Sequence, residues 1–367
     1  MARAPSCAHH GAMEDSWELG ESRHLTRERT GVPREGTAVG DYLLLRRLGS
    51  GAMGTVYVGR HRETAIEHAV KIVDRLTPGS SRRARFEREA AALSRLSHPG
   101  VIRVHQFGIQ ETVGYFSMDL VEGTPLDELV EAGPLPKAEA LRIAGAIAEA
   151  LAHLHAAGIT HRDLKPANVL IRTDDGAPVL VDFGLARVAE DARLTQSAQL
   201  VGTPRYMAPE QILGEQEQVG PATDVFALGV LLCELLGGEL PFRGSDLVSL
   251  ASNIVRGEPE LPADLEPALR SLLLGLLAKA PPNRPTAAWA ADACARLARG
   301  ETVRIRNAFP WRRFLAGASV VGSLSLLVAA ALWTKGSPAP PPPRPSLAGA
   351  GAIVQTASAP ASPPRAP

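Results

Sequence analysis

The stretch His161-Arg162-Asp163-Leu164-Lys165-Pro166-Ala167-Asn168 decides how the rest of the chain is interpreted. It places a carboxylate (Asp163), an ammonium (Lys165) and a carboxamide (Asn168) within one short segment. Transfer of a phosphoryl group needs a carboxylate to orient a hydroxyl, a cation near the migrating group and oxygen ligands for Mg²⁺. The apolar run that follows, Val169-Leu170-Ile171, predicts a strand, so the polar groups lie on a loop that leads into it.

A second carboxylate follows another predicted strand. The apolar run Val179-Leu180-Val181 ends in Asp182-Phe183-Gly184, and Asp182 can share a metal ion with Asn168. Either short motif can arise by chance, but both together, in this order, favour a single site. The two segments resemble the catalytic loop and the Asp-Phe-Gly segment of eukaryotic-type protein kinases.

Composition and charge argue against several other classes of protein. The chain has 367 residues, with 39 basic and 39 acidic side chains, so its net charge does not favour a nucleic-acid partner. Its three cysteines, Cys7, Cys233 and Cys294, form no Cys-x-x-Cys pair, which predicts reduced thiols and neither disulfides nor a zinc site. Residues 1–40 have no apolar segment, so we expect a disordered leader without a signal peptide.

Glycines near residue 50 have the spacing of a phosphate-binding loop. Gly49, Gly51 and Gly54 form the pattern G-x-G-x-x-G, which lets backbone N–H groups approach phosphate oxygens. Dinucleotide-binding folds use the same spacing but continue into a helix. Here Thr55-Val56-Tyr57-Val58 favours a strand, and Lys71 lies in a further β-branched run. This order of elements resembles the small lobe of a kinase.

A helix is predicted over residues 81–97, because apolar residues recur at helical spacing, and His98-Pro99 ends it. Its glutamates Glu87 and Glu89 are both candidates to pair with Lys71. The resemblance implies Glu89, since the partner in the family lies in a Phe-x-x-Glu-Ala pattern. The alternative is that Glu89 is an ordinary solvated residue of the helix surface.

Residues 116–123 resemble the hinge between the two lobes of a kinase. The resemblance implies that Asp119 and Val121 offer main-chain hydrogen bonds to adenine, with Met118 behind the ring and Leu170 beneath it. Each of these residues could equally belong to the core or to a linker. The complete nucleotide-binding set implied by the resemblance is Leu48, Gly49, Ser50, Gly51, Gly54, Val56, Ala69, Lys71, Met118, Asp119, Val121 and Leu170.

From residue 124 the chain is predicted to be mostly helical, with a long Ala-rich helix over residues 138–157. Further on, residues 202–210 resemble the segment that positions the substrate peptide. The resemblance implies that Asp224 braces the backbone of the catalytic loop and that Arg284 pairs with Glu210. The set implied to have structural or peptide-positioning roles is Arg162, Thr203, Glu210, Asp224 and Arg284.

A loop with little periodicity joins Asp182 to about residue 200 and contains the predicted phosphorylation sites Thr195 and Ser197. In the family, an arginine at the position of Arg162 marks kinases whose loop is ordered by phosphate. A phosphate group adds about −1.5 to −2 charge and three acceptor oxygens that an arginine can grip. The alternative is that Thr195 and Ser197 are solvated residues without a regulatory role.

The kinase resemblance covers residues 41–297 and implies an α+β, two-lobed protein kinase fold. Residues 41–121 would form the small β-rich lobe and residues 122–297 the larger helical lobe. The implied activity is transfer of the ATP γ-phosphate to serine or threonine hydroxyls of proteins, with Mg²⁺. The implied catalytic residues are Asp163, Lys165, Lys71 and Glu89, and the implied metal ligands are Asn168 and Asp182.

Three other functions remain as alternatives. A pseudokinase scaffold normally lacks the lysine, the base or a metal ligand, and all of these are present here. A dinucleotide-binding oxidoreductase is disfavoured by the strand that follows the glycines. A kinase that acts on small molecules is disfavoured by the peptide-positioning segment.

Residues 314–333 contain no charged side chain and are long enough, at about 1.5 Å per residue, to cross a bilayer as one transmembrane helix. Trp311 and Trp333 lie at its ends, and arginines are concentrated in the basic linker 298–313. The positive-inside rule therefore predicts a bacterial plasma-membrane protein with a cytoplasmic kinase domain. The alternative is a buried core helix. Ala318 and Gly322 have the spacing of a helix-dimer contact, which predicts a homodimer.

The final segment, residues 334–367, is rich in proline, alanine and serine. Such a composition cannot form a packed core and predicts an extended or disordered tail. With the membrane orientation above, this tail would lie outside the cytoplasm.

Overall fold

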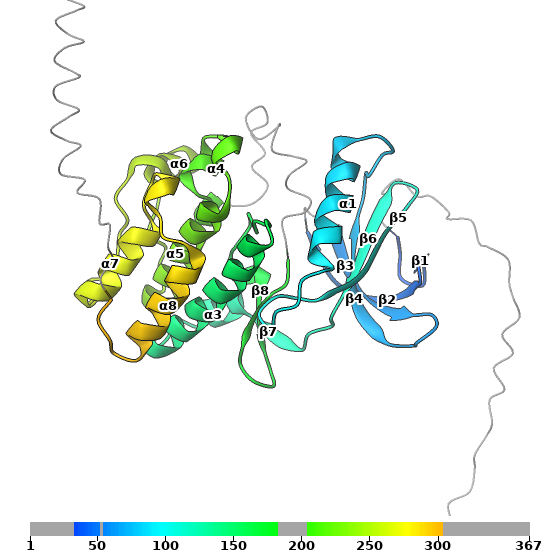
Figure 1. Cartoon of the computed structure of the whole chain (residues 1–367), viewed down its shortest axis with the longest axis horizontal. Coiled ribbons are helices and arrows are strands. Elements are labelled where there is room, and N and C mark those ends of the chain that lie inside the picture. Colours follow the sequence, from blue (N-terminus) through cyan, green and yellow to red (C-terminus); the bar gives the residue numbers. More distant parts are fainter. Residues whose placement is uncertain (1–32, 52–53, 183–203, 304–367) are drawn as a thin grey trace, which may run out of the picture. The chain divides into compact units, whose positions relative to one another are not determined.

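The computed structural model describes residues 33–51, 54–182 and 204–303 of the chain. In these ranges, a region built mainly from strands with one long helix precedes a region built mainly from helices (Figure 1). The predicted two-lobed α+β architecture is therefore confirmed.

The small lobe is an antiparallel sheet of six strands in the order β1-β2-β3-β4-β6-β5. The strands β2 and β3 are joined as a hairpin at the glycine-rich segment, where Gly51 lies opposite Gly54. No helix follows the glycines, in agreement with the prediction. The strands are β1 (Ala38–Val39), β2 (Tyr42–Gly51), β3 (Gly54–His61), β4 (Glu67–Val73), β5 (Val104–Gln110) and β6 (Val113–Met118).

The helix α1 (Ser81–Leu93) packs against the sheet through Phe86, Ala90 and Leu93, which are all buried. Its first turn is capped by Ser80, whose hydroxyl accepts a hydrogen bond from the N–H of Arg83. The helix ends earlier than predicted. The Ser94 hydroxyl bonds the carbonyl of Ala91, and the chain continues as tighter turns, because serine side chains compete with the helical backbone bonds.

A small three-stranded sheet carries the catalytic segments. Its order is β7-β8-β9, and all pairs are antiparallel. The chain after α1 joins it, since the N–H of Ile102 donates to the carbonyl of Leu180 at 2.9 Å. The elements are β7 (Gly123–Pro125), the short 3₁₀ helix η1 (Pro166–Asn168), β8 (Val169–Arg172) and β9 (Pro178–Leu180).

The large lobe is organised around the buried helices α3 and α5. The alanine-rich helix α3 (Lys137–Ala156) packs against α8, α5 and β9. The helix α5 (Pro221–Gly237) begins three residues before Asp224 and ends at Gly238, which adopts the left-handed conformation common at helix ends. The remaining helices are α2 (Leu126–Glu131), α4 (Pro209–Ile212), α6 (Leu247–Arg256), α7 (Pro267–Leu276) and α8 (Ala287–Ala298).

Two apolar clusters fill the large lobe. The main core extends from the small lobe through α3, α5 and α8. A second cluster, which we call the α6 cluster, joins α6 to α4 and α5. Its buried members are Ala208, Phe226, Val230, Phe242, Leu250, Ile254 and Leu277.

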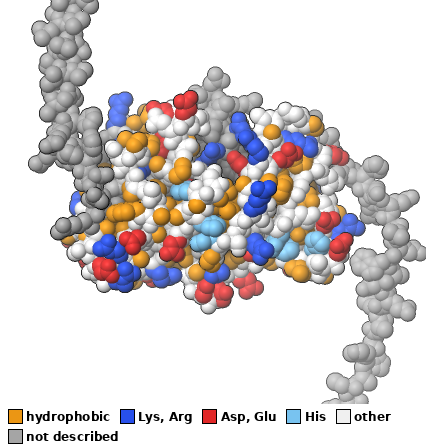
Figure 2. Space-filling model, in the orientation of Figure 1, with side chains coloured by type: hydrophobic (Ala, Val, Ile, Leu, Met, Phe, Trp, Pro, Cys, Tyr) orange, Lys and Arg blue, Asp and Glu red, His pale blue; other side chains and the backbone are white. Residues whose placement is uncertain are grey.

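The structure bears on the predictions about the cysteines, the surface charge and the membrane span only where residues are described. Cys233 and Cys294 are buried free thiols, as expected, and Cys7 lies outside the described residues. Positive and negative side chains are intermixed on the face in Figure 2, in keeping with the balanced net charge. Within residues 33–303, as far as they are described, no helix is long and apolar enough to cross a membrane. The predicted span 314–333 lies outside them.

Candidate active site

The glycine-rich hairpin brings backbone close to the strand that carries Lys71. Leu48, Gly49, Ser50 and Gly51 end β2, while Gly54 and Val56 begin β3. At Gly54 only glycine fits, because φ is +132° and an added Cβ would lie 2.0 Å from the carbonyl oxygen of Ile72.

Lys71 is a buried cation in the middle of the small-lobe sheet. Its main chain pairs with Val56 on one side and Phe116 on the other. The ammonium forms an ion pair with the Asp182 carboxylate, while only 4% of the lysine side chain and 29% of the aspartate side chain is exposed. Two residues separated by more than a hundred positions are thus brought into direct contact.

The predicted pairing of Lys71 with Glu89 is not observed among the described residues and stays a prediction. Among the described residues, Lys71 forms its ion pair with Asp182 and none with Glu89. Burial raises the pKa of Glu89, and the positive charges of Arg162, Arg88 and Arg85 oppose that rise. The charges that act on Glu89 in this structure are therefore those of arginines.

The catalytic segment brings the side chains of Lys165 and Asn168 to Asp163. The Lys165 ammonium donates to Asp163 Oδ2 at 2.9 Å, and the Asn168 amide donates to the same oxygen at 3.1 Å. The same Asn168 nitrogen also donates to the carbonyl of Asp163 at 2.7 Å. Asp163 is 7% exposed. The carboxylate is therefore held in place and faces two donors at one of its oxygens.

Asp224 holds the backbone of the catalytic segment from below. Its carboxylate accepts hydrogen bonds from the N–H groups of His161 and Arg162, both at 2.8 Å, and from His155 Nε2, also at 2.8 Å. Arg162 adopts a left-handed conformation with φ +65°, which costs free energy for a residue other than glycine. The contacts from Asp224, and from Gln211 Nε2 to the carbonyl of Arg162 at 2.9 Å, hold it there.

Two predicted metal ligands have an oxygen available. The Asn168 amide nitrogen is used by Asp163, which leaves its carbonyl oxygen as the ligand atom. The Asp182 carboxylate uses Oδ1 for Lys71, and no described residue bonds Oδ2. Carboxylate and amide oxygens are the ligands that Mg²⁺ prefers, with phosphates and water completing its shell. These residues fit the ion.

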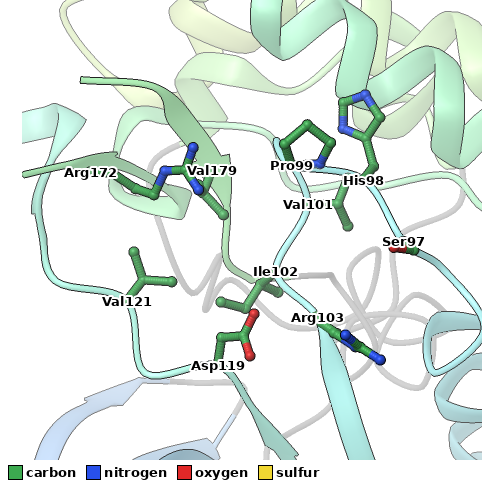
Figure 3. A pocket seen from close by; sticks show the side chains of 10 residues that line it. All are labelled: Ser97, His98, Pro99, Val101, Ile102, Arg103, Asp119, Val121, Arg172 and Val179. Carbon is green, nitrogen blue, oxygen red and sulfur yellow. The ribbon is translucent and has the colours of Figure 1, made fainter. Parts of the chain in front are cut away.

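The predicted adenine-binding residues lie around the chain that joins the lobes. Ala69 and Met118 pair across β4 and β6 and are buried, and Leu170 lies in β8. Asp119 and Val121 belong to the connecting segment. Their side chains line a cavity of about 200 Å³ together with Arg172 and Val179 (Figure 3). A role in binding adenine would therefore rest on their main chain.

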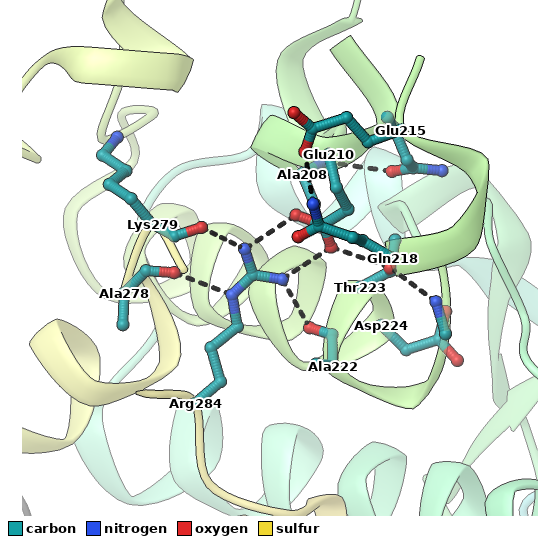
Figure 4. A network of polar contacts seen from close by, with 12 residues as sticks. Ala208, Glu210, Glu215, Gln218, Ala222, Thr223, Asp224, Ala278, Lys279 and Arg284 are labelled. Atoms are coloured by element: carbon teal, nitrogen blue, oxygen red, sulfur yellow. Dashed lines mark hydrogen bonds and ion pairs between the residues drawn. The ribbon is translucent and has the colours of Figure 1, made fainter. Parts of the chain in front are cut away.

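Glu210 and Arg284 form a fully buried ion pair, as predicted (Figure 4). The guanidinium donates to both carboxylate oxygens, at 2.7 and 2.8 Å, and to the carbonyls of Ala222, Ala278 and Lys279. The Thr223 hydroxyl donates to Glu210 Oε1 at 2.8 Å. Burial would raise the pKa of Glu210, but Arg284 holds it below its ordinary value.

Some functional residues were missed from the sequence, and others lie outside the described residues. Sequence reasoning did not identify His155 or Gln211, although Gln211 directly follows the Ala-Pro-Glu motif and could have been noticed there. Thr195, Ser197 and Thr203 belong to residues 183–203, which the structure does not describe.

Comparison with known proteins agrees with this geometry. The family model described as protein kinase domain matches residues 42–294. The serine/threonine-protein kinase PkaA of Streptomyces coelicolor is 38% identical over 261 residues, which cover 67% of this chain and 48% of that protein. The kinase PknD of Mycobacterium tuberculosis is 38% identical over 263 residues, which cover 69% of this chain and 39% of that protein.

A third relative, the serine/threonine-protein kinase PknA of Mycobacterium tuberculosis, is 37% identical over 261 residues, which cover 69% of this chain and 60% of that protein. The chain therefore belongs to the protein kinase family. The matched region spans between about two fifths and three fifths of these relatives.

Proposed function

We propose that this chain is a protein serine/threonine kinase that transfers the γ-phosphate of Mg-ATP to hydroxyl groups of proteins. The observation that supports this most strongly is the Asp163 cluster, in which Lys165 and Asn168 both bond one carboxylate oxygen. These two donors fix the orientation of the Asp163 carboxylate, which is the group that would accept a hydrogen bond from a substrate hydroxyl. Membership of the kinase family supports the same assignment.

Each charge around Asp163 has a distinct part in the proposed reaction. Asp163 orients the acceptor hydroxyl and takes up its proton. Lys165, whose side chain is 38% exposed, can leave Asp163 and neutralise charge on the migrating phosphoryl group. Positioning and electrostatics account for most of the rate in such reactions, because the protein does little covalent work.

Lys71 is proposed to bind the α- and β-phosphates of ATP from β4, the strand that pairs with β3 of the glycine-rich hairpin. In this structure its ammonium is engaged with Asp182. Asp182 and Asn168 would hold Mg²⁺, which supplies neutralisation of phosphate charge when it is bound. Burial of Lys71 in the sheet supports the role, since a buried ammonium interacts strongly with anions that reach it.

The nucleotide base is proposed to bind between the small lobe and β8. Val56 and Ala69 would lie above the ring, Leu170 below it and Met118 behind it. The main chain of Asp119 and Val121 would supply the hydrogen bonds. The side chains of these two residues face the cavity described above, which supports a main-chain role.

Serine and threonine are favoured as acceptors because Lys165 lies two residues after Asp163, as in serine/threonine kinases. The names of the relatives above support this choice. A pseudokinase is disfavoured because the lysine, the base and both metal ligands are brought to one region.

We also propose that the chain is anchored in a bacterial plasma membrane by residues 314–333, with the kinase domain in the cytoplasm. The support is the uncharged length of this segment and the arginines that precede it. A reporter that is active only outside the cytoplasm should work when fused after Pro367 and not when fused after Gly300. The opposite pattern, or release of the protein by a salt wash, would contradict the anchor.

We also propose that two such segments pair through Ala318 and Gly322 to form a homodimer.

Autophosphorylation of Thr195 and Ser197 is proposed to regulate the site. Within the described chain, Arg162 Nε is buried and has no hydrogen-bond partner. The Arg162 charge already acts on Glu89, but its Nε–H still needs an acceptor, and a phosphate group would provide both acceptors and negative charge.

The kinase proposal is tested with the purified full chain, Mg-ATP and histone H1 as a generic basic substrate. The parent should transfer phosphate, and Asp163→Asn should reduce transfer to background while retaining the melting temperature of the parent. Near-parental transfer by Asp163→Asn would refute the assignment of the base. No transfer by the parent would argue for the pseudokinase.

A further inference from the structure

Lys279 is a cation with unusual surroundings at the edge of the α6 cluster. In the part of the chain that the structure describes, its ammonium forms no ion pair with a carboxylate. It donates instead to the carbonyls of Ile254 and Asn253, at 2.6 and 3.3 Å, and lies 3.7 Å from the centroid of the Phe242 ring. Burial and the nearby Arg284 charge lower the pKa of Lys279 to about 7. Burial and the Arg284 charge therefore disfavour the charged form of Lys279, while the two carbonyl oxygens and the face of the Phe242 ring stabilise it.

The two carbonyls belong to the last turn of α6. The Asn253 carbonyl also accepts the N–H of Gly257 at 2.8 Å, so the shorter bond of Lys279, to the carbonyl of Ile254, is its main contact with the helix end. A cation at a helix C-terminus also interacts favourably with the helix dipole. The ring face contributes a cation–π interaction. Lys279 thus fixes the end of α6 at a defined place on the large lobe.

The main chain of the same residue is held by the buried ion pair. Arg284 donates to the carbonyl of Lys279 at 2.8 Å, and the lysine side chain leads away from the pair (Figure 4). The Arg284 guanidinium lies 5.0 Å from the centroid of Phe226, which stacks on Phe242 at 5.8 Å. Two independent routes, one through the main chain and one through the rings, therefore connect Lys279 to Glu210 and Arg284.

The α6 cluster reaches the segment that is predicted to position the peptide. It includes Ala208 and packs against Tyr206, which both lie within that segment, and against Ile212, which follows it. Gln211 in α4 bonds the carbonyl of Arg162, the residue before Asp163. A peptide whose hydroxyl reaches Asp163 must therefore pass beside this segment, and a displaced α6 would shift the surface that it meets.

We propose that Lys279 is a positioning residue for the protein substrate, because it ties the end of α6 to the Glu210–Arg284 pair and so sets the peptide-binding surface beside Asp163. This inference rests on the proposed kinase function. It concerns the binding of the protein substrate and leaves the ATP side of the site unchanged.

The test compares steady-state kinetics of the full chain and its variants with histone H1 and Mg-ATP. Lys279→Met keeps the length of the side chain and removes the ammonium. It should raise KM for histone H1 about fivefold to tenfold, the size expected for losing charge-assisted hydrogen bonds and a cation–π contact. KM for ATP and kcat should remain within about twofold of the parent. Lys279→Arg should restore the parental KM.

Lys137→Met is the matched control, since it removes an exposed ammonium that pairs with Glu266 at 2.6 Å on the same lobe. It should leave both KM values unchanged. Phe242→Leu provides a second route if Lys279→Met does not fold. It should also raise KM for histone H1, and the effect of the double variant should be smaller than the product of the two single effects, because the two residues share the cation–π contact.

The outcomes separate this inference from the function on which it rests. If the parent transfers phosphate but Lys279→Met or Phe242→Leu leaves KM for histone H1 unchanged, the positioning role is wrong. A lowered melting temperature with unchanged kinetics also contradicts it, since a purely structural lysine would behave that way. If the parent transfers no phosphate, the proposed function fails.

Discussion

Two pairs of opposite charges join distant parts of this chain, and they differ in how completely they are satisfied. Glu210 and Arg284 are 1% and 0% exposed, and Arg284 also bonds three main-chain carbonyls. Lys71 and Asp182 meet with the aspartate side chain 29% exposed, and no described residue bonds the second oxygen of that carboxylate.

This difference distinguishes an ion pair that only stabilises the fold from an ion pair whose members can bind a ligand instead of each other. A buried pair with every donor and acceptor used is costly to break and has nothing left to bind a ligand. A pair with an unused oxygen at a partly exposed position can accept a metal ion or give up its partner. We infer that the first pair maintains the fold and that the second belongs to the chemistry.

The largest effect is expected from breaking the buried pair. Arg284→Met leaves Glu210 buried without its cation, so the free energy of unfolding should fall by about 3 to 5 kcal/mol in urea titrations. Arg243→Met is the control, because Arg243 pairs with Glu239 and Glu260 at the surface, and its loss should cost under about 1 kcal/mol. Equal losses in the two variants would remove the distinction.

The next largest effect is expected from removing the two predicted phosphorylation sites, which tests whether the activity of the catalytic site is regulated. Replacing both predicted phosphorylation sites, as Thr195→Ala/Ser197→Ala, should slow phosphate transfer to histone H1 about tenfold, the value of one lost charge-assisted contact. Parent protein treated with phosphatase should start equally slowly and then accelerate in Mg-ATP, whereas the double variant should not. Thr302→Ala, at an exposed position, is the control. Parental rates in the double variant would contradict regulation by these residues.

A smaller effect tests whether the hydrogen bond from Thr223 to Glu210 adds to the stability that the Glu210–Arg284 pair provides. Thr223→Val removes the hydroxyl that bonds Glu210 while keeping the shape of the side chain. The free energy of unfolding should fall by about 1 kcal/mol. Thr302→Val should change it by less than about 0.5 kcal/mol, since that side chain is exposed. A neutral Thr223→Val would mean that Arg284 alone satisfies the carboxylate.

The smallest effect is a dependence of stability on pH. The pKa of Glu210 in the folded chain lies below its ordinary value of 4.5, so the unfolded chain binds the proton more readily. Its contribution to stability is complete above pH 4.5 and is lost as the pH falls through the lowered pKa. In Arg284→Met the carboxyl keeps its burial but loses its cation, so its pKa in the folded chain should lie above 4.5 and its protonation should favour folding. The melting temperature of the variant should therefore fall less than that of the parent as the pH is lowered. Identical pH profiles would contradict this account.

Much of the fold followed from local sequence because the informative residues have local requirements. Gly54 adopts a conformation that only glycine tolerates, and the β-branched residues after it favour the strand that is observed. The apolar spacing in α1 and the alanine-rich pattern of α3 also located these helices.

The partner of Lys71 could not be obtained in the same way. Motif spacing favoured Glu89, but the contact depends on how far α1 lies from β4, and the structure places Asp182 against the lysine instead. Lys279 was missed for a similar reason. Its neighbours Phe242 and Ile254 are distant in sequence, so nothing in the local pattern indicates that the ammonium meets a ring and a helix end.

The most direct test of the contrast between the two pairs is Lys71→Met, examined for phosphate transfer and for the free energy of unfolding in the same preparation. We predict that transfer from Mg-ATP to histone H1 falls to background while the free energy of unfolding changes by less than about 1 kcal/mol, since the Asp182 carboxylate left behind is 29% exposed and can be solvated. Retained transfer, or a loss of stability as large as that of Arg284→Met, would contradict it.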